Sequence, residues 1–242
     1  MNDLFVQSFS IDWDKIAEDS YVRDIEAFHG LTSFELKSPV TFFVGENGTG
    51  KSTLLEAIAI KYGFNPEGGT RNYNFSTYDD YSELCDAIHL SKGYRTANWG
   101  YFLRAESFYN VASKEAEYSL EGGIPEELHN KSHGESFLAT AEKHFRPNGF
   151  YILDEPEAAL SPQRQLSLLI KINECVEDGS QFIIVSHSPI LLSLPDSEII
   201  SFDDGLIHKI SYEETESYKL TRLFINNKNE MIKQLFMQDL FE

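Results

Sequence analysis

Nine residues between two apolar segments constrain this chain more than any other feature: Gly45-Glu46-Asn47-Gly48-Thr49-Gly50-Lys51-Ser52-Thr53. An apolar run at 40–44 precedes them, and leucine and isoleucine at helical spacing follow at 54–59. The spacing G-x-x-x-x-G-K-S/T is informative when a strand precedes it and an amphipathic helix follows it, as here. A glycine-rich turn that ends in Lys-Ser by chance is the alternative, and both flanks argue against it. We interpret the stretch as a phosphate-binding loop, the P-loop.

The residue types within the P-loop suit a polyphosphate. Its three glycines leave no side chains in the way, so successive backbone N–H groups can point at phosphate oxygens. The helix that begins here adds the partial positive charge of its N-terminus. Lys51 supplies a cation for the β- and γ-phosphates, and the Ser52 hydroxyl is placed to ligate Mg²⁺. The residues predicted to bind ATP are Gly45, Asn47, Gly48, Thr49, Gly50, Lys51, Ser52 and Thr53.

The strand pattern predicts one α/β domain over residues 1–242, because this length suffices for a single packed core. Continuous apolar runs at 40–44, 150–153 and 181–185 are typical of strands buried on both faces of a mostly parallel sheet. Alternating apolar and polar residues predict further strands near the N-terminus, which we expect to form an antiparallel β portion.

The helix pattern covers the second half of the chain. A stripe of Leu138, Ala141 and Phe145 predicts a packed helix at 136–144. Ser161-Pro162 predicts the start of another helix, whose expected buried face contains Leu166, Leu169 and Ile170. Residues 199–210 predict a hairpin with an Asp-Gly turn.

Two segments are assigned by their composition. Residues 62–100, rich in Gly, Asn and aromatic residues around 63–77, are expected to form an irregular insertion. Residues 211–242 are expected to form a helical segment that closes the domain. Its apolar positions are Leu220, Leu223, Phe224, Met231 and Leu235.

The composition excludes several classes of protein. With 41% hydrophobic and 24% charged residues, the chain resembles ordinary soluble globular proteins. No apolar run approaches the roughly twenty residues that span a bilayer, and the first residues lack the pattern of a signal peptide. The formal net charge of −19 disfavours sequence-independent binding of nucleic acid, which needs many Lys and Arg facing phosphates. Cys85 and Cys175 have no metal-ligand spacing, so we expect reduced thiols and a cytoplasmic chain.

Two predicted strands are followed by side chains that could take part in metal binding or catalysis. Asp154 and Glu155 follow the run 150–153, and His187 follows the run 181–185. Parallel sheets place their ligands at the carboxyl ends of strands. Asp154 would hold Mg²⁺, Glu155 would orient or deprotonate the attacking water, and His187 would contact the γ-phosphate. Taken alone, each is also compatible with a polar strand end, but the upstream P-loop favours the functional interpretation.

A Ser-His-Gly-Glu-Ser stretch precedes the helix at 136–144. Ser132 and Glu135 have the spacing of a capping box, which stabilises a helix start by about 1 kcal/mol. The serine hydroxyl, the glycine backbone and the helix N-terminus would also form an anion site. These residues alone leave both interpretations open.

The order of these motifs resembles that of the ABC-type ATPases, and within them the small stand-alone bacterial ATPases related to RecF and SMC heads. The resemblance runs from residue 5 to about residue 210. It implies a P-loop NTPase head whose small helical part carries the signature motif Ser132, His133, Gly134 and Glu135. In that family the signature reaches a γ-phosphate bound on a second subunit, and 157–161 crosses the dimer interface. The resemblance further implies ATP and Mg²⁺ as cofactors, His187 as the switch histidine, a homodimer on ATP binding and a protein partner.

The sequence departs from the family pattern at two sites. The usual signature is Leu-Ser-Gly-Gly-Gln, and His133 and Glu135 replace its first glycine and its glutamine. The family also carries a Mg²⁺-binding glutamine after the strand at 101–104. Glu106 is the candidate replacement, with an ordinary surface carboxylate as the alternative. Tyr21 and Phe28 are the candidates for an adenine contact.

Three functions are compatible with these features. The leading hypothesis is an enzyme that hydrolyses ATP to ADP and phosphate between two subunits and couples their closing to a partner protein, by family analogy in DNA repair or phage defence. The second is an ATP-dependent scaffold with negligible turnover, against which Glu155 argues. The third is the motor subunit of a membrane transporter, but such subunits carry Thr or Ser where Glu157 stands. About 80 residues without heptads separate Lys51 from Ser132, which excludes long coiled-coil arms.

Overall fold

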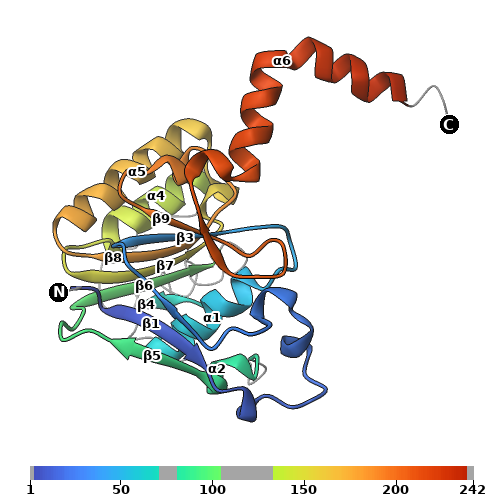
Figure 1. Cartoon of the computed structure of the whole chain (residues 1–242). Helices are drawn as coiled ribbons and strands as arrows, with labels where there is room; N and C mark the ends of the chain where they lie inside the picture. The colour runs from blue at the N-terminus through green and yellow to red at the C-terminus, as the bar shows by residue number, and fades with distance from the viewer. Residues whose placement is uncertain (1–2, 71–80, 105–132, 239–242) are drawn as a thin grey trace.

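A seven-stranded sheet forms the centre of the computed structural model, which describes residues 3–70, 81–104 and 133–238 (Figure 1). The order of its strands is β10-β9-β3-β8-β7-β6-β4. The strands are β3 (Val40–Val44), β4 (Gly69–Thr70), β6 (Trp99–Arg104), β7 (Gly149–Asp154), β8 (Gln181–Val185), β9 (Glu198–Ser201) and β10 (His208–Ile210). The strands from β9 to β6 are parallel, and β10 and β4 run antiparallel at the edges. The predicted α/β fold with a mostly parallel sheet is confirmed.

A second, antiparallel sheet is formed by β1 (Val6–Ile11), which lies between β2 (Ser33–Glu35) and β5 (Ile88–Lys92). The antiparallel β portion is therefore present as predicted. Its third strand comes from the stretch 62–100, which we expected to be irregular, and α2 (Leu84–Ala87) directly precedes it. The strand reads Ile-His-Leu-Ser-Lys, and its alternation rests on only two apolar residues, Ile88 and Leu90, which is too short a pattern to reveal it.

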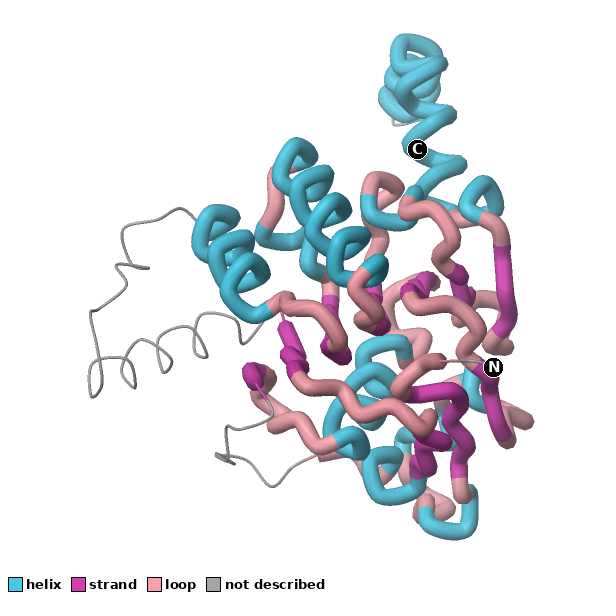
Figure 2. Tube along the Cα trace, turned by 90° about the vertical axis from the view of Figure 1, so that its left-hand side faces the viewer, coloured by secondary structure: helices cyan, strands magenta, loops and turns pink. Residues whose placement is uncertain are grey.

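Helices cover both faces of the central sheet (Figures 1 and 2). One face packs on α1 (Lys51–Tyr62) and the N-terminal sheet, and the other packs on α4 (His133–His144) and α5 (Pro162–Glu177). Neighbouring residues of β3 point to opposite faces, so that Phe43 joins the first core and Phe42 the second. Both faces of β3 are therefore buried from water, which explains its continuous apolar sequence.

The start of α5 is as predicted, but of its predicted buried face only Leu169 packs against the core, where it is partly buried. Ser161 caps the helix, and its hydroxyl accepts a hydrogen bond from the Arg164 N–H at 3.4 Å. Leu166 and Ile170 are exposed to 52% and 63%, so the expectation that they face the core is wrong. The buried positions are Gln165, Leu168, Ile172 and Cys175. Apolar residues occur around most of this helix, and the pattern alone does not set which side meets the sheet.

The hairpin of β9 and β10 forms as predicted. Asp204 and Gly205 have φ angles of 59° and 70°, the positive pair that a type I′ turn requires. This turn reaches the P-loop region, where Asp203 beside it contacts the loop backbone.

The C-terminal helix α6 (Glu216–Gln238) extends away from the body of the molecule (Figure 1). Leu220, Leu223 and Phe224 are exposed, as is Leu235, so the expectation that this helix closes the domain is wrong. Its backbone departs from helical geometry at Asn227. Within the described part of the chain, no helix combines the length and the apolarity needed to cross a bilayer.

Candidate functional site

Three neighbouring strands bring the predicted site residues to one edge of the sheet. β8 lies between β3 and β7, and all three run in the same direction. Their carboxyl ends therefore lie side by side, with the P-loop after β3, Asp154 and Glu155 at the end of β7, and His187 beyond β8. Parallel sheets bind ligands at this edge.

The P-loop backbone requires its glycines. Gly45, Gly48 and Gly50 have φ angles of 140°, 86° and 93°, which L-residues rarely adopt. A Cβ atom on Gly50 would lie 2.7 Å from the Ile25 side chain, whereas one on Gly48 would meet nothing within 4 Å. The loop is therefore packed against protein at Gly50 and has free space at Gly48, where a ligand has room.

Lys51 begins α1 and turns its side chain back along the loop. Its Nζ donates to the carbonyl oxygens of Gly45 and Glu46 at 2.7 and 2.6 Å. Burial lowers the pKa of this lysine, while the carboxylates of Asp203, Glu155, Asp154 and Glu46 act in the opposite direction. These contacts hold the ammonium group within the loop, at the position from which it would reach bound phosphates.

The two predicted Mg²⁺ ligands with described side chains lie together. The Ser52 Oγ donates to Oδ1 of Asp154 at 3.1 Å, although 102 positions separate the residues in the sequence. A hydroxyl beside a carboxylate supplies the hard oxygen atoms that Mg²⁺ prefers. This pair could hold a Mg²⁺ ion.

Glu155 and His187 face each other from adjacent strand ends. The Nε2 atom of His187 lies 3.8 Å from Oε1 of Glu155 and makes no hydrogen bond to the described residues. Glu155 has φ 48° and ψ 53°, a left-handed conformation that is uncommon outside glycine. Its N–H donates to the Val185 carbonyl at 3.0 Å. This bond ties the strained turn to the strand that leads to His187.

Glu157 is a site residue whose contacts the sequence did not reveal. Its Oε1 atom accepts hydrogen bonds from the Ser186 hydroxyl at 2.9 Å and from the His187 N–H at 2.5 Å. Its Oε2 atom is buried without a hydrogen bond among the described residues. Burial raises the pKa of this carboxyl, and the two hydrogen bonds partly oppose the shift. Glu157 therefore fixes the backbone from which the His187 ring projects.

A second connection joins the same two turns. The Gln165 side chain donates to the Leu160 carbonyl at 3.1 Å and accepts from the Ser188 hydroxyl at 2.5 Å. The Ser188 N–H donates in turn to the Ser186 Oγ at 3.1 Å. Because Gln165 and Ser188 are buried, these bonds are protected from water and rigidify the turns.

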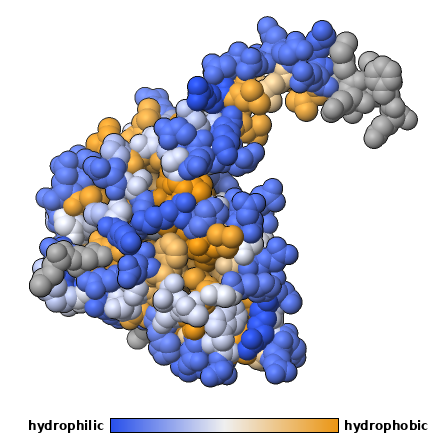
Figure 3. Space-filling view, in the orientation of Figure 1, coloured by the Kyte–Doolittle hydropathy of each residue, from blue (hydrophilic) through white to orange (hydrophobic). Residues whose placement is uncertain are grey.

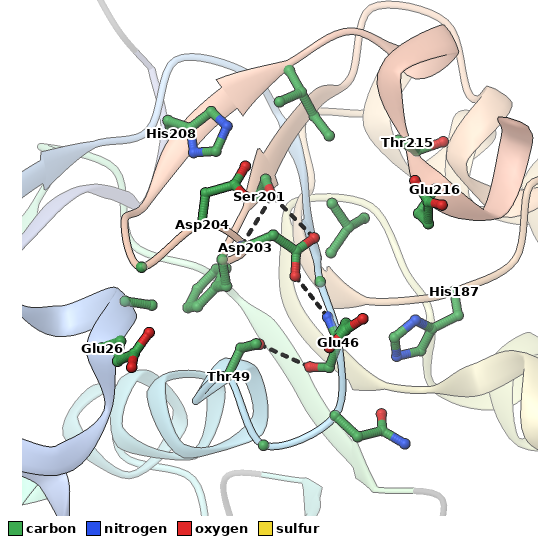
Figure 4. A pocket seen from close by; sticks show the side chains of 18 of the residues that line it. Glu26, Glu46, Thr49, His187, Ser201, Asp203, Asp204, His208, Thr215 and Glu216 are labelled. Carbon is green, nitrogen blue, oxygen red and sulfur yellow. Dashed lines mark hydrogen bonds between the residues drawn. The ribbon is translucent and has the colours of Figure 1, made fainter.

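A cavity of about 1140 Å³ opens beside the P-loop, between the segment 21–27, the β9–β10 hairpin and the first turn of α6 (Figure 4). Asp203 forms part of its wall and accepts from the Glu46 N–H at 2.8 Å. This carboxylate also receives the Ser201 hydroxyl at 3.3 Å. Asp203 thus holds the first turn of the P-loop. No local sequence pattern indicates this role, because 157 positions separate the partners.

The two candidates for an adenine contact have different surroundings. Phe28 is completely buried and lies against Gly50 and Phe202, so its ring is not accessible to a base. Tyr21 is 55% exposed and lines the cavity beside the P-loop. The geometry therefore keeps Tyr21 as a candidate and removes Phe28.

The remaining predicted residues are placed as follows. Asn47, Gly48 and Thr49 line the cavity, and the Thr49 hydroxyl donates to the Glu46 carbonyl at 2.9 Å. Thr53 lies in the first turn of α1. His133, Gly134 and Glu135 form the first turn of α4. Ser132 and Glu106 lie outside the described residues, so the capping box and the replacement of the family glutamine stay predictions.

This fold and this site define a P-loop nucleotide-binding protein. Two family profiles match the sequence: "AAA domain" over residues 21–120, and "AAA domain, putative AbiEii toxin, Type IV TA system" over residues 135–193. The first includes the P-loop, and the second includes Asp154, Glu155 and His187. These matches to two parts of the chain support the resemblance to ABC-type P-loop ATPases that the order of motifs indicates.

Several solved structures are similar to this chain. The SMC head domain from Thermotoga maritima is 16% identical, with a TM-score of 0.46, over 86% of this chain and 99% of that one. An ATP-binding subunit of an ABC transporter is 16% identical, with a TM-score of 0.46, over 76% of this chain and 83% of that one. CbiO1 from Clostridium perfringens, part of the ABC transporter complex cbiONQ, is 15% identical, with a TM-score of 0.44, over 86% and 91% of the two chains. No curated protein matches the sequence.

Proposed function

We propose that this protein is an ATPase that binds Mg-ATP in the P-loop and hydrolyses it to ADP and phosphate. The observation that carries the proposal is the meeting of three strand ends. There the Ser52–Asp154 pair and the Glu155–His187 pair lie beside a glycine loop that contains Lys51. A scaffold that only bound ATP would need the first pair but would have no use for the second.

Each residue has a role that follows from its position. Lys51 and the loop N–H groups would bind the β- and γ-phosphates, while Ser52 and Asp154 would hold Mg²⁺. When bound, Mg²⁺ neutralises negative charge on the phosphate oxygens. Glu155 accepts a proton from the attacking water or orients it, and His187 donates a hydrogen bond to the γ-phosphate. Glu157 keeps His187 in the position that this contact needs.

We further propose that two chains face each other with ATP between them. The resemblance to ABC-type ATPases supports this arrangement, in which Ser132 to Glu135 of one chain approach the γ-phosphate bound by the other. Binding would close the dimer and hydrolysis would reopen it, and this motion would be transmitted to a partner protein. We place the activity in the cytoplasm, because Cys85 and Cys175 are both free thiols buried in the core.

Steady-state hydrolysis by Glu155→Gln tests the proposal. The amide fills the same space but accepts no proton, so kcat should fall about a hundredfold or more, while ATP affinity stays within a few-fold. Glu174→Gln, the same change at an exposed position of α5, is the matched control and should leave turnover unchanged. Near-normal turnover by Glu155→Gln would remove Glu155 from this role.

Light scattering tests the dimer. Glu155→Gln in Mg-ATP should have twice the mass of the nucleotide-free protein, because hydrolysis no longer opens the closed form. The free protein should be mostly monomeric, since two chains of charge −19 repel each other. An unchanged mass in Mg-ATP would contradict the facing arrangement, and a measured turnover would then belong to the monomer.

A further inference from the structure

The C-terminal helix α6 is firmly attached at its base and free beyond it. Thr215 is buried, and its hydroxyl donates to the Tyr212 carbonyl at 2.7 Å. The Tyr212 hydroxyl donates to the Pro189 carbonyl at 2.8 Å, which ties this base to the body. From 219 to 230 every residue is exposed. The base therefore sets the direction of α6 up to the kink at Asn227, and no described part of the chain covers residues 219–230.

One side of α6 is apolar. Leu220, Leu223 and Phe224 have the i, i+3, i+4 spacing of a single helix face and are exposed to 57%, 51% and 38%. Figure 3 shows hydrophobic side chains along the side of α6 that is turned toward the body. A contiguous apolar face that remains exposed along a helix is typical of an interaction site.

The charge of α6 differs in sign from that of the rest of the chain. Residues 216–238 contain four Lys or Arg and two Asp or Glu, a net charge of +2. The other residues contain 16 Lys or Arg and 37 Asp or Glu, a net charge of −21. A basic helix on so acidic a protein is electrostatically complementary to a second copy of the same chain, and two such helices would repel each other.

Residues 12–26 form an acidic surface. Residues 12–26 carry six Asp or Glu against two Lys or Arg. Asp14, Glu18, Asp19 and Asp24 are exposed, and none forms an ion pair with a described residue. The guanidinium group of Arg23 is turned inward onto backbone carbonyls. The exposed ring of Tyr21 adds apolar area beside these carboxylates.

Both elements border the same cavity. Tyr21 and Asp24 line one part of the cavity beside the P-loop, and Thr215, Lys219 and Leu220 line another. If two copies face each other with their P-loops, as in the proposed function on which this inference rests, a two-fold axis relates them. In that arrangement, the base of α6 and the 12–26 segment both belong to the face of each copy that carries the P-loop.

We propose that α6 is a clasp: in the dimer its apolar face and flanking basic residues dock on the 12–26 segment of a second copy of this chain. The contact is reciprocal, so each dimer contains two clasps. Binding of ATP brings the two faces together, and the clasps then hold them.

Charge reversal in the full-length chain tests the clasp. The dissociation constant of the dimer is measured by light scattering in Mg-ATP, with Glu155→Gln as the background of every variant. Lys219→Glu with Arg222→Glu should raise this constant about tenfold or more, because four charge pairs per dimer become repulsive. Asp19→Lys with Asp24→Lys should do the same. All four changes in one chain should return the constant to within about threefold of the starting value.

A charge-matched control separates the clasp from a change in net charge. Arg164→Glu with Lys171→Glu on α5 also removes four units of charge and should leave the dissociation constant within about threefold. If the α6 pair has no larger effect than this control, or if the four-fold variant shows no rescue, the clasp is refuted while the proposed ATPase stands. If Mg-ATP produces no dimer at all, the facing arrangement fails and the clasp fails with it.

Two substitutions on α6 test whether its apolar face contributes to the dimer. Leu223→Ser should weaken the dimer about tenfold or more, since each dimer buries two such side chains. Ile225→Ser removes a side chain that is 70% exposed on the opposite side of α6 and should have little effect. Equal effects of the two substitutions would contradict docking through this face.

Discussion

Replacement of Glu157 by alanine should slow hydrolysis without weakening nucleotide binding. Glu157 contacts neither the P-loop lysine nor the Ser52–Asp154 pair, according to its hydrogen bonds, and holds instead the N–H of His187 and the hydroxyl of Ser186. The substitution should therefore displace the histidine while the phosphate cradle stays intact.

The structure sets the size of the expected effects. A buried donor left without an acceptor costs about 1–3 kcal/mol. The Ser186 hydroxyl can rotate to another acceptor, so the His187 N–H is the main loss. Removal of a buried carboxylate also relieves its desolvation, which offsets part of the cost. We expect a loss of about 1–2 kcal/mol in the free energy of unfolding, or about 2–8 °C in the melting temperature.

The effect on turnover should be larger than the effect on stability. A displacement of a catalytic group by about 1 Å can reduce a rate about a hundredfold. We expect kcat of Glu157→Ala to fall between about tenfold and a hundredfold, measured by phosphate release at saturating ATP. The dissociation constant of a fluorescent ATP analogue should change less than about twofold, because no phosphate contact is removed.

Two further variants distinguish positioning from a general loss of structure. Glu157→Gln keeps an oxygen acceptor in place and should retain kcat within about threefold. Glu157→Ala combined with His187→Ala should be no slower than His187→Ala alone, since the residue acts through the histidine. Additive losses in the double variant, or a glutamine variant as slow as the alanine variant, would refute the reasoning.

Three other predictions follow from the site. Lys51→Ala and Ser132→Arg should each be inactive, but mixing them should restore up to about a quarter of wild-type turnover if each site uses both chains. Full activity of Ser132→Arg alone would leave Ser132 as a helix cap. Random duplex DNA should bind only at tens of micromolar or weaker at physiological salt, because the net charge is −19; tight, salt-sensitive binding in a filter assay would contradict this. Burial raises the pKa of Glu157 above its ordinary 4.5, so the folded state holds this proton to higher pH than the unfolded state does. The free energy of unfolding should therefore fall as the pH rises from the pKa of Glu157 in the unfolded state to its raised pKa in the folded state. Urea titrations of Glu157→Gln should not show this dependence on pH.

The sequence determined the features that depend on neighbouring residues. The P-loop glycines, the continuous apolar strands and the Ser161-Pro162 helix start are local patterns, and each has a local physical cause in backbone sterics, burial or capping. The Asp-Gly turn of the β9–β10 hairpin belongs with them. The sequence also predicted that Asp154, Glu155 and His187 follow buried strands, because strands alternate with helices along the chain.

Only the tertiary structure decided which distant groups meet. The insertion of β8 between β3 and β7 brings His187 within 3.8 Å of Glu155. The left-handed turn at Glu155 leads into the turn from which Glu157 reaches the His187 backbone. Asp203 reaches the P-loop across 157 positions. Hydrogen bonds between turns that are distant in the sequence produce no periodic pattern of residues, because they depend on how the sheet positions the two turns.

The two errors about helix faces have the same origin. The apolar spacing of α6 is what a core-facing helix would show, and Leu166 and Ile170 of α5 are as apolar as the residues buried beside them. The spacing of apolar residues indicates that one side of a helix is hydrophobic, but it does not indicate which part of a protein covers that side. For α5 the sheet covers a neighbouring face, and for α6 no described part of the same chain covers it. In the proposed clasp, residues 12–26 of a second copy cover this face, and the periodicity of α6 does not indicate which segment it meets.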